Sequence, residues 1–154
     1  MNKDIKKEFS KYLKSQRLMT LATCADKPWV ATVYFAVDND LNFYFVSSPK
    51  SKHCKDIEKN SKVAVNVADS HTPNSAKKVG IQAQGVASQV KGWERTKVLL
   101  KMWHRAAPGM EGVVNVKSMK EKIISSRVYK IQPTFIKYFN QKLYGEEGCK
   151  TVRL

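Results

Sequence analysis

The residues best suited to chemistry gather in one short stretch. Three hydroxyls, an ammonium and an imidazole fall within seven residues, at Ser47, Ser48, Ser51, Lys52 and His53. They follow a strand-like segment and stand where a helix-like segment begins. A helix start carries unpaired N–H donors and a partial positive charge, which together favour a phosphate. The stretch therefore predicts an anion site. The alternative is that the serines end a strand and cap a helix while the lysines are solvated.

Two strands and a helix must position this stretch. Trp29–Asp38 and Leu41–Val46 are dense in β-branched and aromatic residues and predict a hairpin. Asp38-Asn39-Asp40 between them supplies side chains that tolerate positive φ. Ser51–Lys59 predicts a helix with Cys54 and Ile57 facing the core.

The rest of the chain reads as further strands with helices at the periphery. Strands are predicted over 18–24, 62–68, 79–90, 127–131 and 134–139, with Pro133 breaking the last two apart. A helix is predicted over 1–17, with an apolar face formed by Ile5, Phe9, Tyr12 and Leu13. A second helix is predicted over 93–105, with an apolar stripe at Val98, Leu99, Met102 and Trp103, and a third over 118–125. Residues 69–78 predict a loop. About six strands without a regular βαβ series favour one mostly β domain over residues 1–154, a closed or partly closed antiparallel barrel.

Composition narrows the classes of partner. The 154 residues carry a formal net charge of +15, which permits nucleic acid, acidic membranes or phosphorylated ligands. The lysines are dispersed along the chain, a pattern that favours solubility over a nucleic-acid footprint. No apolar run is long enough to span a bilayer and the N-terminus does not resemble a signal peptide, so a cytoplasmic location is expected.

The cysteines and histidines indicate neither a disulfide framework nor a metal site. Cys24, Cys54 and Cys149 are odd in number and match no zinc spacing. Free, buried thiols in a reducing compartment are the expected state. The three histidines form no ligand pair at helical spacing, so no metal is predicted.

Several short motifs together resemble a known family. They are Leu21-Ala22-Thr23 followed by Pro28, Phe45-Val46-Ser47, Ser51-Lys52-His53, and Asn60-Ser61-Lys62-Val63-Ala64. In this order they resemble the FMN-binding split barrels related to pyridoxamine 5′-phosphate oxidase. The resemblance spans roughly residues 18–139 and implies a mostly β fold, a six-stranded antiparallel split β-barrel with peripheral α-helices.

The resemblance also implies a cofactor and its site. Members of the family hold FMN in a groove at a homodimer interface, and the strand-end hydroxyl and the Ser-x-Lys segment hold its phosphate. By position, hydroxyls would come from Ser47, Ser48 and Ser51, and charge from Lys52 and His53. The backbone at Ala31, Thr32 and Val33 would border the flavin ring, which Gln84 and the segment beginning at Trp103 would approach. Exposed glutamines facing solvent are the simpler reading of Gln84.

Three functions follow from this sequence. The first is a dimeric, FMN-dependent oxidoreductase acting on an unknown small molecule. The second is a module of the same fold that holds flavin or haem without turnover, and the third is a basic barrel associated with nucleic acid. No catalytic acid or base is identifiable, and the arginines that would grip pyridoxal phosphate are not evident in the sequence, where Arg153 is isolated near the end.

Overall fold

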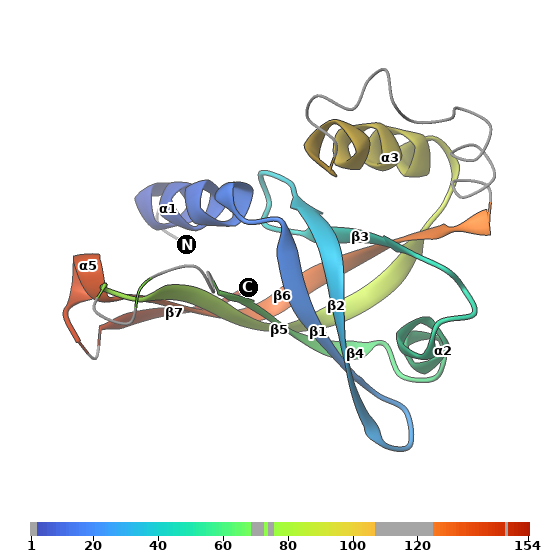
Figure 1. Cartoon of the computed structure of the whole chain (residues 1–154), viewed down its shortest axis with the longest axis horizontal. Helices are drawn as coiled ribbons and strands as arrows, with labels where there is room; N and C mark the ends of the chain where they lie inside the picture. Colours follow the sequence, from blue (N-terminus) through green and yellow to red (C-terminus); the bar gives the residue numbers. More distant parts are fainter. Residues whose placement is uncertain (1–2, 69–72, 74–75, 107–124, 147) are drawn as a thin grey trace.

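Six antiparallel strands close into a barrel, and a seventh extends it (Figure 1). This computed structural model describes residues 3–68, 73, 76–106, 125–146 and 148–154; of residues 3 and 100–106 it describes the backbone. The strands are β1 (Leu18–Cys24), β2 (Pro28–Val37), β3 (Phe43–Ser47), β4 (Lys62–Ala68), β5 (Val79–Val90), β6 (Arg127–Asn140) and β7 (Cys149–Arg153). Their order is β3-β2-β1-β4-β5-β6-β7, and pairing of β3 with β6 closes the barrel. The predicted six-stranded antiparallel barrel is confirmed.

β6 corrects one prediction. Pro133 does not break the chain into two strands, because Arg127–Asn140 is continuous. The register with β5 shifts at Gln84/Gly85, so Gln84 pairs with Phe135 and Gly85 pairs with Pro133. A proline is tolerated at such an irregularity because a ladder hydrogen bond is already missing there. Gly85 suits this point, because a Cβ on it would lie 2.5 Å from the Gln132 carbonyl oxygen.

The β2–β3 turn forms where the sequence predicts it, but the residue with positive φ is Leu41 and not one of Asp38-Asn39-Asp40. Leu41 adopts φ 64° and is fully buried. The carboxylate of Asp38 accepts hydrogen bonds from the backbone N–H groups of Asp40 and Asn42 at 2.8 and 2.9 Å. This carboxylate organises the loop, and burial of the Leu41 side chain favours the left-handed backbone that its residue type disfavours.

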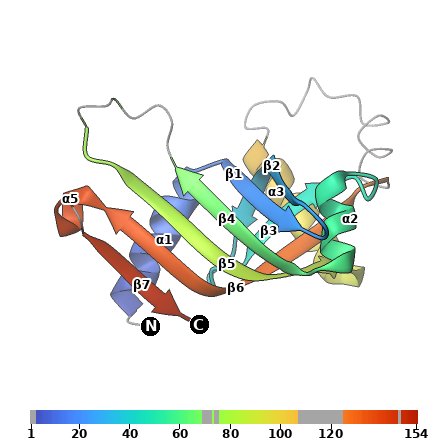
Figure 2. The same ribbon diagram turned by 90° about the horizontal axis from the view of Figure 1, so that it is seen from below.

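The helices lie outside the barrel. They are α1 (Lys3–Ser15), α2 (Lys52–Lys59), α3 (Gly92–Ala106) and the short α5 (Gln141–Tyr144). Figures 1 and 2 place α2 at one end of the barrel, away from α1, while α3 lies over β2 and β3. The predicted helix at 118–125 and most of the predicted loop at 69–78 lie outside the described residues. No helix in the described part of the chain is long and apolar enough to cross a membrane.

Strand alternation builds the core. The inward-facing residues of the strands pack with Phe9 and Leu13 of α1, as the helical face of the N-terminal segment predicts. A smaller cluster, formed by Tyr44, Val90, Val98 and Val128, lies beneath α3. Cys54 is buried as predicted, whereas Cys24 and Cys149 are exposed, which corrects the expectation of three buried thiols. Both exposed cysteines lie at strand ends, where side chains reach solvent.

Candidate functional site

A split between β2 and β3 creates the site. Pairing of these strands ends at Phe35↔Phe45, two residues before Ser47. Beyond that point β2 continues along β1 while β3 continues along β6. α2 follows directly after β3 and packs against β1 and β2 at the opening. The end of β3 and the beginning of α2 therefore meet at one rim of the barrel (Figure 2).

Three predicted side chains converge at this rim. Ser47 Oγ lies 2.8 Å from His53 Nε2, and Ser51 Oγ lies 3.1 Å from the same nitrogen. The two hydroxyl oxygens are 3.3 Å apart. His53 is only 8% exposed and packs against the Phe45 ring, so its imidazole is held in place. The sequence grouped these residues by spacing, and the structure brings their polar atoms together.

The beginning of α2 keeps donors available. Ser51 occupies the N-cap position but makes no capping hydrogen bond within the described structure. Its hydroxyl instead donates to the Ser48 carbonyl oxygen at 2.8 Å. The first N–H groups of an α-helix have no partner inside the helix. Those of Lys52, His53 and Cys54 thus leave a partial positive charge beside the serine–histidine cluster.

Lys52 is less available than its type suggests. Its ammonium forms an ion pair with Asp56, one turn further along α2. Asp56 is buried and also accepts a hydrogen bond from the Thr23 hydroxyl at 3.0 Å. Lys52 first and Thr23 second hold the pKa of this carboxyl below its ordinary value, although burial opposes them. The ion pair lies within α2, and the hydrogen bond from Thr23 to Asp56 joins α2 to β1.

A thiol and a phenol lie beneath the cluster, and neither was predicted to belong to a site. Burial alone would raise the pKa of the Cys54 thiol, but the polar side chains of His53, Ser51 and Tyr129 lower that pKa below its usual range. Burial, with Cys54 adding to it, raises the pKa of Tyr129 to about 12. The Tyr129 hydroxyl is buried with no hydrogen-bond partner among the described residues.

Arg127 is a cation that sequence reasoning missed. It begins β6 directly opposite Ser47, so the two side chains share one face of the β3–β6 ladder. Its guanidinium donates to Glu58 of α2 at 2.7 Å. Val30–Phe35 contains no arginine that could grip a phosphate. Arg127 brings a guanidinium opposite Ser47 from a distant segment, although Glu58 pairs with its charge.

The remaining predicted residues lie elsewhere. Ser48 is exposed and its hydroxyl accepts from the N–H of Lys50 at 3.2 Å. On β2, Ala31 is half-buried, Thr32 faces outward, and Val33 faces the core, so Val33 can border a ligand only through its backbone. The side chain of Trp103 lies outside the described residues.

Gln84 is on the outer face of the sheet. Successive pairings place Val30, Ala22, Ala64 and Gln84 in one row across β2, β1, β4 and β5. Three strand spacings separate Gln84 from β2, about 14 Å. Gln84 lines two grooves of 320 and 550 Å³ on this face. Along β6, Gln84 pairs with Phe135 whereas Ser47 pairs with Arg127, eight residues or about 26 Å away, so one subunit does not bring Gln84 to the serine–histidine cluster.

The fold and this rim define a class: a split-barrel protein in which two hydroxyls and an imidazole gather where β3 meets α2. The sequence family described as pyridoxamine 5′-phosphate oxidase matches residues 5–138, so the chain belongs to that family. Among curated protein sequences, none matches this chain.

Solved structures share the fold at low sequence identity. General Stress Protein 26 from Bacillus anthracis has a TM-score of 0.67 and 21% identity, over 97% of this chain and 98% of its own. A conserved hypothetical protein from Mycobacterium tuberculosis has a TM-score of 0.72 and 19% identity, over 96% of this chain and 90% of its own. The haem storage protein HutZ from Vibrio cholerae has a TM-score of 0.66 and 16% identity, over 94% and 92%.

Proposed function

We propose that this chain is an FMN-binding protein, a flavin-dependent oxidoreductase acting on a small molecule. The observation that carries the proposal is the convergence of Ser47, Ser51 and His53 at the uncapped beginning of α2. Two hydroxyls, an imidazole and backbone N–H groups fit the oxygens of a phosphate monoester. Arg127, which is ion-paired with Glu58, places a guanidinium on the facing strand opposite Ser47.

Each residue has a definite part in this proposal. Ser47 and Ser51 hold the phosphate, and His53 donates to it when its Nε2 carries a proton. The backbone of β2 at Ala31, Thr32 and Val33 borders the ring. Bound flavin supplies the electron-transfer chemistry, while the protein supplies orientation and electrostatics. Lys52 contributes positive charge at a distance, because Asp56 holds its ammonium.

A homodimer completes the proposal. The outer face of β1 and β2 exposes Leu18, Val30 and Tyr34, at 47%, 59% and 58%. Leu18 and Tyr34 are direct cross-strand neighbours, so they form one apolar patch. Exposed apolar patches of this kind mark interaction sites. A second subunit on this face would cover the grooves around Gln84 and bring that side chain near the partner's rim.

An FMN titration tests the function. We expect the purified protein to show flavin absorbance, or to quench the fluorescence of added FMN with a one-to-one endpoint. No binding at saturating FMN would reject the proposal. Oxidation of a reduced nicotinamide by the loaded protein then separates an oxidoreductase from a carrier.

A haem-binding module is the second candidate. The observation that favours it is the shared fold with HutZ, which is a haem storage protein. Titration with haemin distinguishes the two candidates, because haem gives a sharp Soret band and FMN does not. Preferential binding of haemin, with FMN failing to compete, would make this the function.

A further inference from the structure

A second basic region lies apart from the rim, between α1 and the β2–β3 turn. A groove of 610 Å³ is lined by Lys6, Lys7, Ser10, Lys11, Lys14 and Asn39, and we name it the α1 groove. None of these residues belongs to the serine–histidine cluster. The volume falls within the range of sites that hold small ligands.

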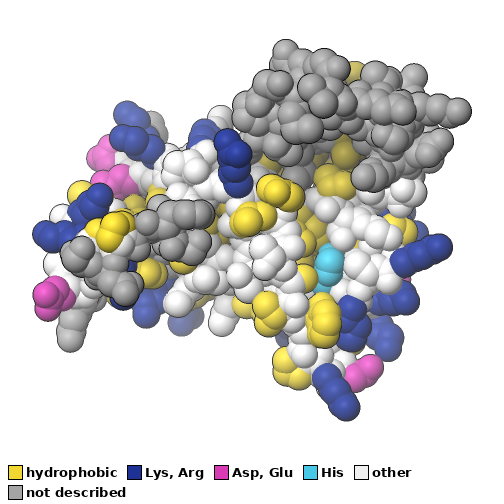
Figure 3. Space-filling view, viewed as in Figure 1, with side chains coloured by type: hydrophobic (Ala, Val, Ile, Leu, Met, Phe, Trp, Pro, Cys, Tyr) yellow, Lys and Arg dark blue, Asp and Glu magenta, His cyan; other side chains and the backbone are white. Residues whose placement is uncertain are grey.

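The packing of α1 explains why lysines gather there. Phe9 and Leu13 are fully buried in the barrel core, so the opposite face of the helix must turn outward. Lys6 and Lys14 are eight residues apart, which is about 12 Å along a helix. The helix thus presents a row of ammonium groups, while other lysine and arginine side chains are distributed over the face seen in Figure 3.

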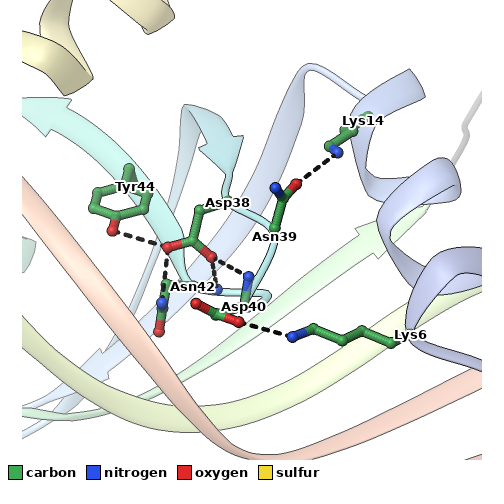
Figure 4. Close-up of polar contacts among 7 residues, drawn as sticks. All are labelled: Lys6, Lys14, Asp38, Asn39, Asp40, Asn42 and Tyr44. Carbon is green, nitrogen blue, oxygen red and sulfur yellow. Dashed lines mark hydrogen bonds and ion pairs between the residues drawn. The ribbon is translucent and has the colours of Figure 1, made fainter. Parts of the chain in front are cut away.

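The turn forms the other wall of the α1 groove. Lys6 Nζ lies 2.7 Å from Asp40 Oδ1, and Lys14 Nζ donates to Asn39 Oδ1 at 3.2 Å (Figure 4). These contacts join two segments that are 34 and 25 residues apart in the chain. They hold the walls in a fixed relation and leave a concave surface between them.

The charge of the α1 groove is not balanced. Asp40 neutralises Lys6, but no described carboxylate pairs with Lys7, Lys11 or Lys14. The Asp38 carboxylate is occupied by Asn42 and Tyr44 within the turn. Glu8 accepts from the Tyr144 hydroxyl at 2.9 Å and is engaged with α5 instead. Three positive charges therefore line one small groove.

We propose that the α1 groove binds a linear oligophosphate, the chemistry shared by inorganic polyphosphate and the phosphate chain of a nucleotide. Lysine suits this ligand because an ammonium recognises phosphate as a point charge without demanding a planar, bidentate geometry. The Ser10 hydroxyl adds a neutral donor between the ammonium groups. Among the described residues that line the groove, none has an aromatic side chain on which a nucleobase could stack, which favours the phosphate chain over single-stranded nucleic acid.

Calorimetric titration with tripolyphosphate tests the proposal. The variant Lys7→Gln/Lys11→Gln should lose affinity by at least about tenfold, since it removes two charge-assisted contacts. The control Lys27→Gln/Lys91→Gln changes the net charge equally at two exposed lysines outside the groove, and should stay within about twofold of wild type. Wild-type affinity should fall steeply between about 50 and about 200 mM salt.

Further variants and ligands separate the sources and the sites. Ser47→Ala/Ser51→Ala should keep the component of tripolyphosphate binding that depends on Lys7 and Lys11, because the α1 groove does not depend on the rim; it can lose only binding at the rim. If ATP binds with the same affinity as tripolyphosphate, the phosphate chain is sufficient for recognition. If ATP binds with higher affinity, the ligand is a nucleotide. Three results would overturn the proposal. They are an equal loss of affinity in the two lysine variants, no binding of millimolar tripolyphosphate by wild type, and a loss of affinity in the serine variant alone. Tighter binding of a single-stranded oligonucleotide that depends on Lys7 and Lys11 would overturn it too.

Discussion

The rim at α2 and the α1 groove are both suited to phosphate, but they are built differently. At the rim, two hydroxyl oxygens lie within 3.1 Å of one buried imidazole nitrogen. In the α1 groove, Lys7 and Lys11 are exposed lysines with long side chains. Neutral donors that are already held in position recognise the geometry of a phosphate and lose little conformational entropy on binding. Ammonium groups on long side chains recognise the charge of a phosphate, and salt weakens that attraction. Selectivity is therefore expected at the rim, and breadth at the groove.

The largest expected effect is a loss of folding stability when the core beneath the rim is disrupted. Phe45 is fully buried, stacks on Tyr129 at 5.1 Å and lies two residues before Ser47. Phe45→Ala should lower the free energy of unfolding by about 3–5 kcal/mol, because it leaves a cavity in the core. Lys11→Gln, in contrast, should change it by less than about 0.5 kcal/mol. Urea denaturation measures both, and similar values for the two variants would show that the rim does not depend on the core.

Removing the rim hydroxyls gives the next largest effect. Ser47→Ala/Ser51→Ala should weaken FMN binding well over tenfold, because hydrogen bonds to charged groups contribute about 1.5–3 kcal/mol each. Ser88→Ala, at an exposed position on β5, is the matched control and should bind FMN like wild type. Lys52→Ala should have a smaller effect than the serine pair, since Asp56 holds the ammonium. Unchanged affinity in the double variant, measured by fluorescence quenching, would place the phosphate elsewhere.

The two regions should also respond differently to subunit contacts. Val30→Glu/Tyr34→Glu places charge on the exposed apolar patch and should yield a monomer that binds FMN about tenfold more weakly. Tripolyphosphate binding should persist, because α1 is outside that patch. Trp93→Glu, at a residue that is 71% exposed on α3, should leave the mass unchanged. Light scattering after size exclusion gives the masses, and a dimer that survives the double substitution would exclude this face as the interface.

Acid sensitivity gives the smallest effect and compares one carboxylate from each region. Lys52 and Thr23 lower the pKa of the Asp56 carboxyl. Burial opposes a lower pKa at Asp38, but hydrogen bonds from Asn42, Tyr44 and the N–H of Asp40 together outweigh it and lower the pKa of that carboxyl. A carboxyl with a depressed folded-state pKa contributes stability above its unfolded value, about 3.9, and loses it as pH falls through the folded value. Unfolding measured between about pH 5 and about pH 2 should therefore show stability falling on acidification.

Substitution of either Asp56 or Asp38 should reduce the stability that the protein loses on acidification. Asp56→Asn and Asp38→Asn are each expected to reduce the slope of stability against pH. Asp26→Asn serves as the control, because its side chain is 81% exposed and lies 3.5 Å from Lys59. A slope that changes as much in Asp26→Asn as in the other two would mean that the acid response comes from the net charge of the whole protein.

Local pattern predicted much of the fold. Clean alternation in 62–68 and 79–90 identified β4 and β5 and their inward faces, because a strand alternates its side chains regardless of its partner. Pro133 misled the prediction of β6, since a one-residue register shift opposite Gly85 accommodates it. The positive φ at Leu41 also had no local signal, because burial in the barrel outweighs the preference of a leucine.

The amino-acid sequence by itself determined strands β1 to β5, the amphipathic face of α1, and the cluster of hydroxyls and imidazole before α2, since these depend on spacing within a few residues. Only the tertiary structure decided that Arg127 faces Ser47, that Asp56 holds Lys52 while also bonding Thr23, and that α1 lies against the β2–β3 turn. The physical reason is that strand register and helix docking, which follow from burial of the whole core, bring together residues that are distant along the chain.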